Sequence, residues 1–324
     1  MSVEIATRKR LVFAAGRSNP ELAAEIAAEL GTEVAEVELN DFANGEIYMR
    51  YGANVRGADV FIFQTHTHPI NTAIMEQLIM IDAAKRASAK RISAVIPFYG
   101  YSRQDRKARG REPISARLLA DMLTAAGADR VLSVDLHADQ IQGYFDFPFD
   151  HLTALPLLVD HLKEKFNGDL VVVSPDAGRI RVAEKFAGRL HAPLAILHKR
   201  RRSDMRNASE TALEVIGEVE GKRCVLVDDM IDTAGTVTNG AKVLMDFGAE
   251  EVYACVTHPI LSDPATDRIK NSPIKELIVT NTLPVPSEKL IDKISVLSIA
   301  PIVAKTIRAV FEDKSVSEIF QGEN

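Results

Sequence analysis

The sequence predicts an α/β protein with two domains, each built on a mainly parallel, doubly wound sheet. Short apolar runs alternate with stretches of helical periodicity along the chain, which is typical of strands joined by crossover helices. The chain has 324 residues, which exceeds the usual size of a domain with a single hydrophobic core. The alternation restarts near residues 150–156, which favours a boundary between two domains of similar architecture.

The first domain is expected over residues 1–153. Asn19 or Ser18 can cap its opening helix, because Pro20 suits the first helical turn and Gly31 suits a helix end. Its strands are expected at 11–14, 60–63, 92–96 and 131–135, and its helices at 20–30, 72–87 and 114–126.

The second domain is expected over residues 154–307, and the tail 308–324 is expected to pack on the first domain. The segment VLSVDLHADQIQ from residue 131 resembles VLVDDMIDTAGT from residue 225, which supports the hypothesis of a duplicated architecture. The strands are expected at 170–174, 194–197, 224–228, 252–257, 276–280 and 296–299.

Composition argues against several classes of protein. The formal net charge of −6 provides no global basic field for nucleic acid or an anionic membrane surface. Cys224 and Cys255 are the only cysteines and lie in apolar strand patterns, which fits buried hydrophobic residues in a reducing compartment. Charged residues follow Met1 closely, and no apolar run is as long as a membrane span. We therefore expect a soluble, cytoplasmic protein without nucleic-acid or membrane partners.

The run VLVDDMIDTAGT carries an apolar strand directly into two carboxylates and a turn of small residues. Backbone N–H groups and hydroxyls of Thr233 to Thr236, at the start of the next helix, can surround one phosphate. Asp228 and Asp229 suit the vicinal hydroxyls of a sugar or a magnesium ion. The alternative is an ordinary turn with two solvated acids, but paired acids at a strand end lack a packing role. The run therefore predicts a ribose-phosphate site.

Two loops rich in cations follow predicted strands. The first carries Arg103, Arg106, Lys107, Arg109 and Arg111, and the second is HKRR from His198. Such runs are often only solvated surfaces. Together, however, they favour closure over a polyanion such as a triphosphate, because phosphoryl transfer depends on charge stabilisation.

Three further turns carry candidate ligands. His137 follows Asp135 at a strand end and can bind a metal or phosphate, or simply a backbone group. Asp176 can join His137 in a magnesium site or cap the next helix. FANGE, from Phe42 to Glu46, can stack on a purine or form a plain turn. His66-Thr67-His68 lacks a third ligand at a suitable spacing, so a structural role is preferred there.

Seven motifs in this order resemble the ribose-phosphate pyrophosphokinase family across nearly the whole chain: FANGE, VIPFYGYSRQDRK, GREPISARLLADML, DLHADQIQGYFD, SPDAG, HKRR and VDDMIDTAGT. The resemblance implies two phosphoribosyltransferase-like domains. It also implies a magnesium-dependent transfer of the diphosphoryl group of ATP to O1 of ribose 5-phosphate, giving 5-phosphoribosyl 1-diphosphate and AMP.

The resemblance also implies roles for single residues. Lys199 and Arg201 match catalytic cations, and His137 and Asp176 match the magnesium partners. ATP binding is implied for Phe42, Asn44, Glu46, Arg103, Gln104 and His137, the first three from a neighbouring subunit. Ribose 5-phosphate binding is implied for Asp228, Asp229, Asp232, Thr233, Ala234, Gly235 and Thr236.

The family further offers an inhibitory site for ADP or phosphate between subunits, in a homo-oligomer that is expected to be a hexamer built from dimers. Asp139 and Asn54 stand where some members have serine, Ala234 where many have glycine, and Arg179 where a second glycine is common. Candidate effector residues are Arg56, Arg111, Gln142, Ser315, Val316, Ser317 and Phe320.

Other classes are less consistent with the motifs. A phosphoribosyltransferase would share VDDMIDTAGT but would not need FANGE or GYSRQDRK. A silent regulatory subunit would be expected to interrupt HKRR or VDDMIDTAGT, and both are unbroken here. Nucleic-acid binding through residues 198–206 is disfavoured, because the chain is acidic and this segment lacks aromatic residues.

Overall fold

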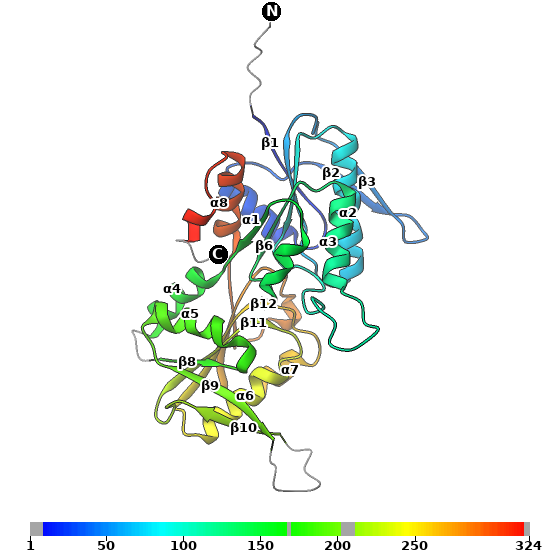
Figure 1. Ribbon diagram of the computed structural model, residues 1–324. Helices are drawn as coiled ribbons and strands as arrows, with labels where there is room; N and C mark the ends of the chain where they lie inside the picture. The colour runs from blue at the N-terminus through cyan, green and yellow to red at the C-terminus, as the bar shows by residue number, and fades with distance from the viewer. Residues whose placement is uncertain (1–8, 167–169, 202–210, 321–324) are drawn as a thin grey trace, which may run out of the picture. The chain divides into compact units, whose positions relative to one another are not determined.

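The computed structural model describes residues 9–166, 170–201 and 211–320. The chain forms two compact units (Figure 1), one of residues 1–153 with 300–324 and one of residues 154–299. The division at 153/154 lies where the sequence pattern restarts. The stretch 300–307, which the sequence placed in the second domain, groups instead with the first unit. The reason is that α8 (Ala300–Phe311) packs on α1 (Pro20–Leu30).

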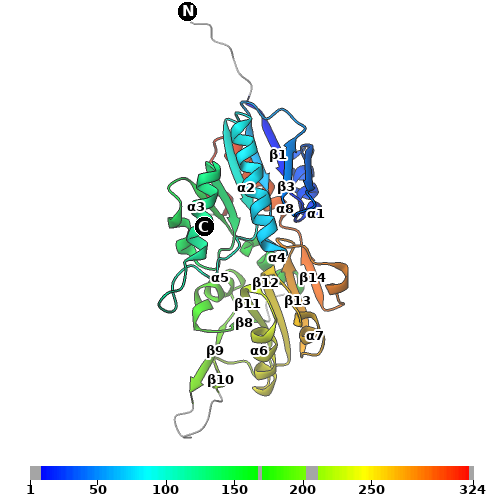
Figure 2. The same cartoon turned by 90° about the vertical axis from the view of Figure 1, so that its right-hand side faces the viewer.

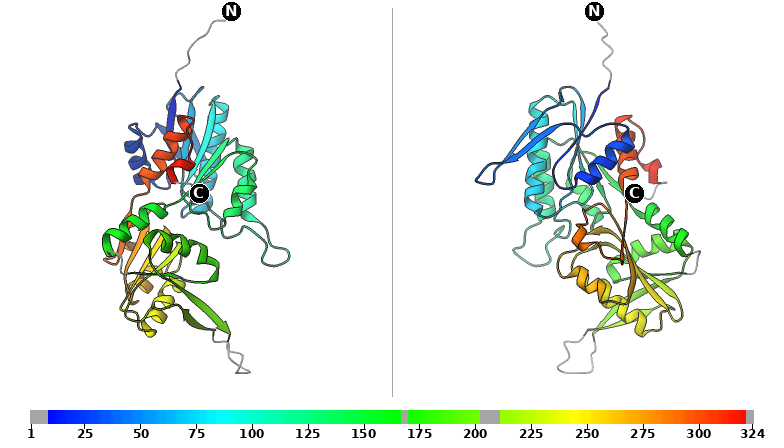
Figure 3. Two further views of the ribbon diagram at one scale, coloured as in Figure 1. Left: turned by 60° about the vertical axis from the view of Figure 1, so that its left-hand side comes forward. Right: turned by 180° about the vertical axis from the view of Figure 1, so that it is seen from behind.

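The first unit contains a five-stranded parallel sheet in the order β1-β4-β5-β6-β7. Helices α1 and α8 cover one face, and α2 and α3 cover the other (Figure 3). The interior strands are buried on both sides, which explains their continuous apolar sequences. The elements not yet bounded are β1 (Leu11–Ala15), β4 (Asp59–Phe63), α2 (Ile70–Arg86), β5 (Arg91–Ile96), α3 (Ser115–Ala126), β6 (Arg130–Val134), the 3₁₀ helix η1 (Asp139–Tyr144), β7 (Phe149–Leu152) and the 3₁₀ helix η4 (Ser317–Phe320).

The predicted caps of α1 are present. Asn19 accepts a hydrogen bond from the backbone N–H of Leu22 at 3.2 Å, and Pro20 is the first helical residue. Gly31 ends the helix with a left-handed backbone, at φ +71°, which glycine adopts without steric cost. Leu22 and Ile26 are fully buried and attach the helix to the sheet.

A hairpin between α1 and β4 was not predicted. Strands β2 (Val37–Asp41) and β3 (Ile47–Tyr51) pair antiparallel and project from the unit (Figure 1). Their residues alternate between half-buried and exposed, so the apolar signal in the sequence is weak. The turn of this hairpin carries FANGE.

The second unit contains a seven-stranded sheet in the order β10-β9-β8-β11-β12-β13-β14, in which β10 is antiparallel and the other pairs are parallel. Helices α4 and α5 pack together on one side, and α6 and α7 on the other (Figure 2). Its elements are α4 (Leu155–Phe166), β8 (Val171–Ser174), the 3₁₀ helix η2 (Ala177–Arg179), α5 (Ile180–Leu190), β9 (Leu194–Arg201), β10 (Thr211–Ile216), β11 (Arg223–Ile231), α6 (Gly235–Asp246), β12 (Glu251–Pro259), α7 (Ala265–Lys270), β13 (Ile274–Thr280), the 3₁₀ helix η3 (Ser287–Lys289) and β14 (Ile294–Leu297).

The strand order of this sheet reverses next to β8. From β8 the chain moves outward to β9 and β10, and it then returns to pair β11 with the other side of β8. In open α/β sheets, ligands bind at the carboxyl ends of the strands where the order reverses. The fold therefore directs attention to the loops after β8 and β11.

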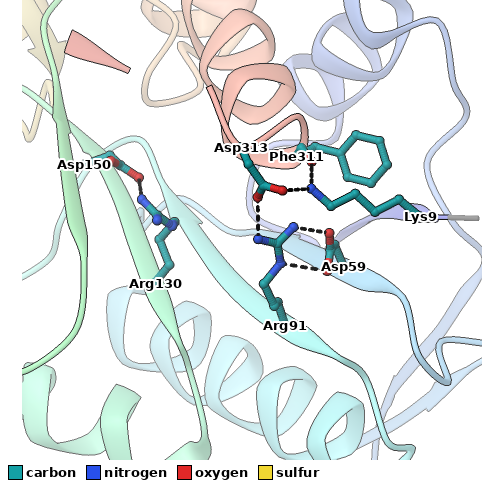
Figure 4. A network of polar contacts seen from close by, with 7 residues as sticks. All are labelled: Lys9, Asp59, Arg91, Arg130, Asp150, Phe311 and Asp313. Atoms are coloured by element: carbon teal, nitrogen blue, oxygen red, sulfur yellow. Dashed lines mark hydrogen bonds and ion pairs between the residues drawn. The ribbon is translucent and has the colours of Figure 1, made fainter. Parts of the chain in front are cut away.

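An ion-pair network attaches the segment after α8 to the first sheet (Figure 4). The guanidinium of Arg91, on β5, pairs with Asp59, a residue of β4 that is only 3% exposed. Arg91 also donates to Asp313 at 2.8 Å, and Asp313 in turn pairs with Lys9. This network fixes the position from which the tail starts.

His66 has a structural role, as the sequence suggested. It is buried, and its Nδ1 accepts a hydrogen bond from the backbone N–H of Gly100 at 2.9 Å. The opposite ring nitrogen, Nε2, lies 3.0 Å from Oε1 of Gln77. Because Nδ1 is an acceptor here and the Gln77 oxygen needs a donor, the arrangement selects the neutral ring with its proton on Nε2.

We expect this histidine to weaken the fold in acid. Burial lowers the pKa of His66 from 6.5 to about 4, so the unfolded chain binds the extra proton between these values. Stability is then lost as the pH falls from about 6.5 to 4, by up to about 3 kcal/mol. Thermal unfolding between pH 7 and pH 4.5 should show a steeper loss for the wild type than for His66→Asn, which keeps an acceptor for Gly100. Equal slopes would contradict the assignment.

Among the described residues, no helix is both long enough and apolar enough to span a membrane.

Candidate active site

The segment after β8 and the end of β11 bring two acidic residues and an arginine together. Strand β11 pairs with β8 only as far as Leu226, opposite Val173, and then continues alongside β12. Asp228 and Asp229 lie on this extension, so they belong to the strand itself and not to the turn after it. Both contact Arg179, the residue directly after the SPDAG turn that follows β8.

The two carboxylates form a buried acidic pair. Asp229 is 5% exposed at its side chain, and its backbone N–H donates to Asp228 Oδ1 at 2.9 Å. Burial raises the pKa of Asp228 well above its ordinary value, the adjacent Asp229 carboxylate raises it further, and Arg179 acts in the opposite direction. Arg179 Nε lies 3.2 Å from Asp228 Oδ1, and Arg179 Nη2 lies 3.0 Å from Asp229 Oδ1.

The turn after β11 leads into the N-terminus of α6. Ala234 precedes the helix in a left-handed conformation, at φ +60°, and its carbonyl accepts from both the N–H and the hydroxyl of Thr238. Thr233 and Thr236 are exposed, whereas Asp232 and Gly235 are half-buried. A helix N-terminus flanked by exposed hydroxyls provides donors and a dipole that favour an anion.

In the first unit, the cationic loop after β5 rests on η1. Gln140 and Tyr144 of η1 both donate to Asp105, the former to its carboxylate and the latter to its carbonyl. Arg103 and Gln104 immediately precede Asp105 and are exposed. The same η1 region follows β6 through Asp135, which has the strained backbone angle φ +37°.

His137 lies in the turn between that strained residue and η1, and it is half-buried. The first unit therefore brings His137 and the Arg103–Gln104 pair onto two turns that Asp105 links. Both turns follow the carboxyl ends of neighbouring parallel strands, β5 and β6.

Asp176 caps the 3₁₀ helix η2, accepting from the N–H of Gly178 at 2.8 Å through Oδ1. This is the structural alternative that the sequence left open. The cap engages one carboxylate oxygen, and a carboxylate has two. In the described part of the chain, no group of three or more His, Cys, Asp and Glu residues is placed to hold a metal on its own.

Comparison with known proteins gives one consistent answer. Residues 11–127 match the model of the N-terminal domain of ribose phosphate pyrophosphokinase, and residues 204–321 match the phosphoribosyl synthetase-associated domain. A ribose-phosphate pyrophosphokinase of Streptomyces coelicolor is 59% identical over 313 residues, which cover 96% of each chain. This chain belongs to the ribose-phosphate pyrophosphokinase family. Family membership and the ribose-phosphate pyrophosphokinase activity, both predicted from the motifs, are confirmed by these relatives.

Other relatives agree. A ribose-phosphate pyrophosphokinase of Mycobacterium leprae is 53% identical over 319 residues, covering 98% of this chain and 97% of that protein. The crystal structure of phosphoribosylpyrophosphate synthetase from Mycobacterium smegmatis has a TM-score of 0.89 and 53% identity, and it covers 94% of this chain and 100% of that one. The predicted fold class, α/β with mainly parallel sheets, is confirmed.

Within this family member, FANGE forms the tip of the β2–β3 hairpin. The Phe42 ring is 55% exposed and meets the edge of Tyr48, with 6.0 Å between ring centroids. Asn44 accepts from the N–H of Glu46 at 3.2 Å, which shapes the turn. An exposed aromatic ring on a projecting hairpin is available for stacking on a base. Contact of Phe42 with adenine is compatible with this geometry and stays a prediction.

The candidate catalytic cations, Lys199 and Arg201, lie at the end of β9. Lys199 and Arg201 pair in register with Leu213 and Thr211 of β10, which places them where the hairpin leaves the sheet. Their side chains lie outside the described part of the structure. Their role therefore stays a prediction from the family resemblance.

The candidate effector residues lie on separate segments of the first unit. Arg56 lines an open cavity of about 420 Å³ with Arg50, Tyr51 and Asn54. Its backbone N–H donates a hydrogen bond to Asn54 Oδ1 at 2.9 Å. Arg111 is exposed in the loop after β5. Gln142 of η1 contacts His151 Nδ1 at 3.3 Å. In the tail, Ser315 and Ser317 are exposed and Val316 is half-buried, while the side chain of Phe320 lies outside the described residues.

Two arginines of the site were not assigned from the sequence. Arg179 was noticed but left undecided, since its contact with Asp228 depends on the pairing of β8 with β11. Arg268, on α7, donates to the carbonyl of Thr233 at 2.9 Å and so supports the turn from Asp232 to Thr236, the candidate phosphate turn. The contact joins residues 35 positions apart, so no pattern within the α7 sequence predicts it.

Glycine at position 234 should relieve the strain of the phosphate turn. A left-handed backbone costs a non-glycine residue about 1 kcal/mol, and the greater freedom of glycine in the unfolded chain offsets part of the gain. We therefore expect Ala234→Gly to stabilise the protein by about 0.5 kcal/mol, measured by thermal unfolding. The matched control is Ala241→Gly in the buried interior of α6, which should destabilise it by at least about 1 kcal/mol. A loss of stability in Ala234→Gly would contradict the prediction.

Proposed function

We propose that this chain transfers the diphosphoryl group of ATP to O1 of ribose 5-phosphate, giving 5-phosphoribosyl 1-diphosphate and AMP for nucleotide and amino-acid biosynthesis. O1 forms a bond to the β-phosphorus as the bond from that phosphorus to the α,β-bridging oxygen breaks. AMP leaves with that oxygen, and the O1 proton is released. The acidic pair and phosphate turn at the strand-order reversal are the observation that carries the proposal, together with family membership.

The ribose site is proposed to have two parts. Asp228 and Asp229 accept hydrogen bonds from the ribose hydroxyls, and Asp232 with Thr233 to Thr236 binds the 5-phosphate. The arrangement supports this division, because the acidic pair lies on β11 and the turn lies at the start of α6. The 5-phosphate is thereby separated from the carboxylates of Asp228 and Asp229, which would repel it.

The nucleotide is proposed to bind through exposed groups on the loops. Arg103, Gln104 and His137 hold ATP, and Phe42, Asn44 and Glu46 contact its adenine from a neighbouring subunit. Lys199 and Arg201 stabilise the diphosphoryl group during transfer. No covalent nucleophile is required, so positioning and charge neutralisation account for the catalysis.

Magnesium is the proposed cofactor, with His137 and Asp176 as its protein partners. Magnesium is usually held by one or two carboxylates together with substrate phosphates and water, so a half-buried Asp176 with one oxygen engaged in a cap fits this mode of binding. When bound, the ion neutralises phosphate charge. The chain's own cations and backbone N–H groups orient the phosphates.

A homo-oligomer is also proposed, in the form of a hexamer built from dimers, since an adenine site shared between subunits requires assembly. ADP and phosphate are proposed effectors at the residues around Arg56, and the protein is proposed to act in the cytoplasm. Sedimentation equilibrium would test the assembly, and a monomer with full activity would contradict it.

The activity is tested by AMP formation from ATP and magnesium, measured with and without ribose 5-phosphate, with products identified by mass spectrometry. AMP and 5-phosphoribosyl 1-diphosphate should appear together and only with the sugar. Formation of ADP, or no reaction, would contradict the proposal.

Asp228→Asn should weaken ribose 5-phosphate binding by about 10- to 100-fold, because a hydrogen bond to a charged acceptor contributes about 1.5–3 kcal/mol. The readout is the KM for ribose 5-phosphate at saturating ATP. Asp246→Asn, an exposed change at the far end of α6, should leave that KM unaltered. An unchanged KM in Asp228→Asn would count against a ribose contact.

A further inference from the structure

The acidic pair already has a cation from the protein itself. The guanidinium of Arg179 bridges Asp228 and Asp229 through Nε and Nη2, at 3.2 and 3.0 Å. All three side chains are at least five-sixths buried, with 16% of Arg179, 16% of Asp228 and 5% of Asp229 exposed. Solvent and salt therefore screen these contacts much less than those of a surface ion pair.

The contacts with Asp228 and Asp229, and not the dipole of helix α5, account for a cation at position 179. It stands at the start of α5, where the helix dipole disfavours a cation. The parallel pairing of β8 with β11 places this helix start beside the extension of β11. A glycine at position 179, as is common in the family, would have no side chain to make the bridge.

Two adjacent buried carboxylates are unfavourable without positive charge nearby. In many sites a divalent cation supplies it. We propose that Arg179 takes the place of a divalent cation at Asp228 and Asp229, so that this chain binds the sugar of ribose 5-phosphate without a metal ion. This inference rests on the proposed function, which assigns the two carboxylates to the ribose hydroxyls.

The geometry is compatible with sugar binding. Arg179 engages Oδ1 of each residue, and each carboxylate has about four lone-pair sites over its two oxygens, so acceptor capacity is left for hydroxyls. The guanidinium keeps its charge at any working pH. A bound metal, in contrast, depends on its free concentration. Ribose 5-phosphate affinity in the absence of nucleotide should therefore be insensitive to magnesium.

The test is isothermal titration calorimetry of ribose 5-phosphate into the full-length protein, without ATP, in EDTA and in millimolar magnesium chloride. The wild type should show the same Kd in both buffers within about twofold. Arg179→Gly should bind about tenfold more weakly in EDTA, as expected for loss of a charge-assisted contact, and magnesium should restore most of the affinity. Arg179→Lys keeps the positive charge but lacks the planar guanidinium that contacts both carboxylates. Its Kd in EDTA should therefore lie between those of the wild type and Arg179→Gly.

Arg181→Ala is the matched control, since Arg181 is an exposed arginine two residues further along the chain, in the first turn of α5, and its Kd should equal that of the wild type. Should Arg179→Gly fail to fold, the wild type and Arg179→Lys carry the test. Metal-dependent binding by the wild type, or undiminished binding by Arg179→Gly in EDTA, would overturn the inference and leave the proposed function standing. Absence of wild-type binding in both buffers would overturn the inference, whereas the proposed function fails only if the assay for AMP and 5-phosphoribosyl 1-diphosphate also shows no reaction.

Discussion

Alanine at Lys199 or Arg201 should lower turnover by about 100- to 1,000-fold, while the KM for ribose 5-phosphate changes by less than about threefold. The physical reason is that these cations are proposed to stabilise charge on the diphosphoryl group during transfer. The sugar, in contrast, is proposed to bind at the acidic pair and the phosphate turn. Both residues lie at the end of β9, away from β11 in the sheet order, with β8 between the two strands. Steady-state kinetics with each substrate varied in turn separates the two effects.

Lys242→Ala is a suitable control for these variants, since Lys242 is an exposed cation on α6 outside the proposed site. It should leave both parameters within about twofold of the wild type. Equal losses in turnover and in ribose 5-phosphate affinity for Arg201→Ala would instead place that residue in substrate binding.

Arg91→Ala should destabilise the first unit by about 3–5 kcal/mol, because it leaves the buried carboxylate of Asp59 without its cation. The same change removes the contact with Asp313, so the segment after α8 loses one of its attachments (Figure 4). For a unit of this size we expect the midpoint of thermal unfolding to fall by about 10 °C. Differential scanning calorimetry measures it directly.

Arg86→Ala provides the comparison, since Arg86 forms an exposed pair with Asp82 within one helix and its loss should cost less than about 0.5 kcal/mol. The double variant Asp59→Asn with Arg91→Ala should recover part of the lost stability, because no buried charge is then left uncompensated. Equal midpoints for Arg86→Ala and Arg91→Ala would show that the buried pair is not important for stability.

Much of the fold could be predicted from local patterns. The parallel strands are nearly continuous apolar runs, and the caps of α1 at Asn19 and Gly31 are encoded within a few residues. The β2–β3 hairpin was missed because its half-exposed strands carry little apolar signal. The grouping of α8 with the first unit depends on packing against α1, a contact between opposite ends of the chain that no local pattern encodes.

In the candidate site, too, the locally encoded features could be predicted and the long-range contacts could not. The VDDMIDTAGT turn was recognisable because strand, acids, small residues and helix lie in one continuous segment. The bridge from Arg179 to the acidic pair was not, because it needs β8 and β11 to be neighbours and β11 to extend past its partner. Likewise, the support that Arg268 gives to Thr233 joins two elements through the fold alone.

The most direct test of the central claim, transfer of an intact diphosphoryl group, uses ATP labelled at the β-phosphorus and, in a parallel reaction, ATP labelled at the γ-phosphorus. With magnesium and ribose 5-phosphate present, both labels should appear in 5-phosphoribosyl 1-diphosphate, and the AMP should carry neither. Transfer of the γ-label alone, with the β-label found in ADP, would contradict the account and indicate an ordinary phosphotransferase.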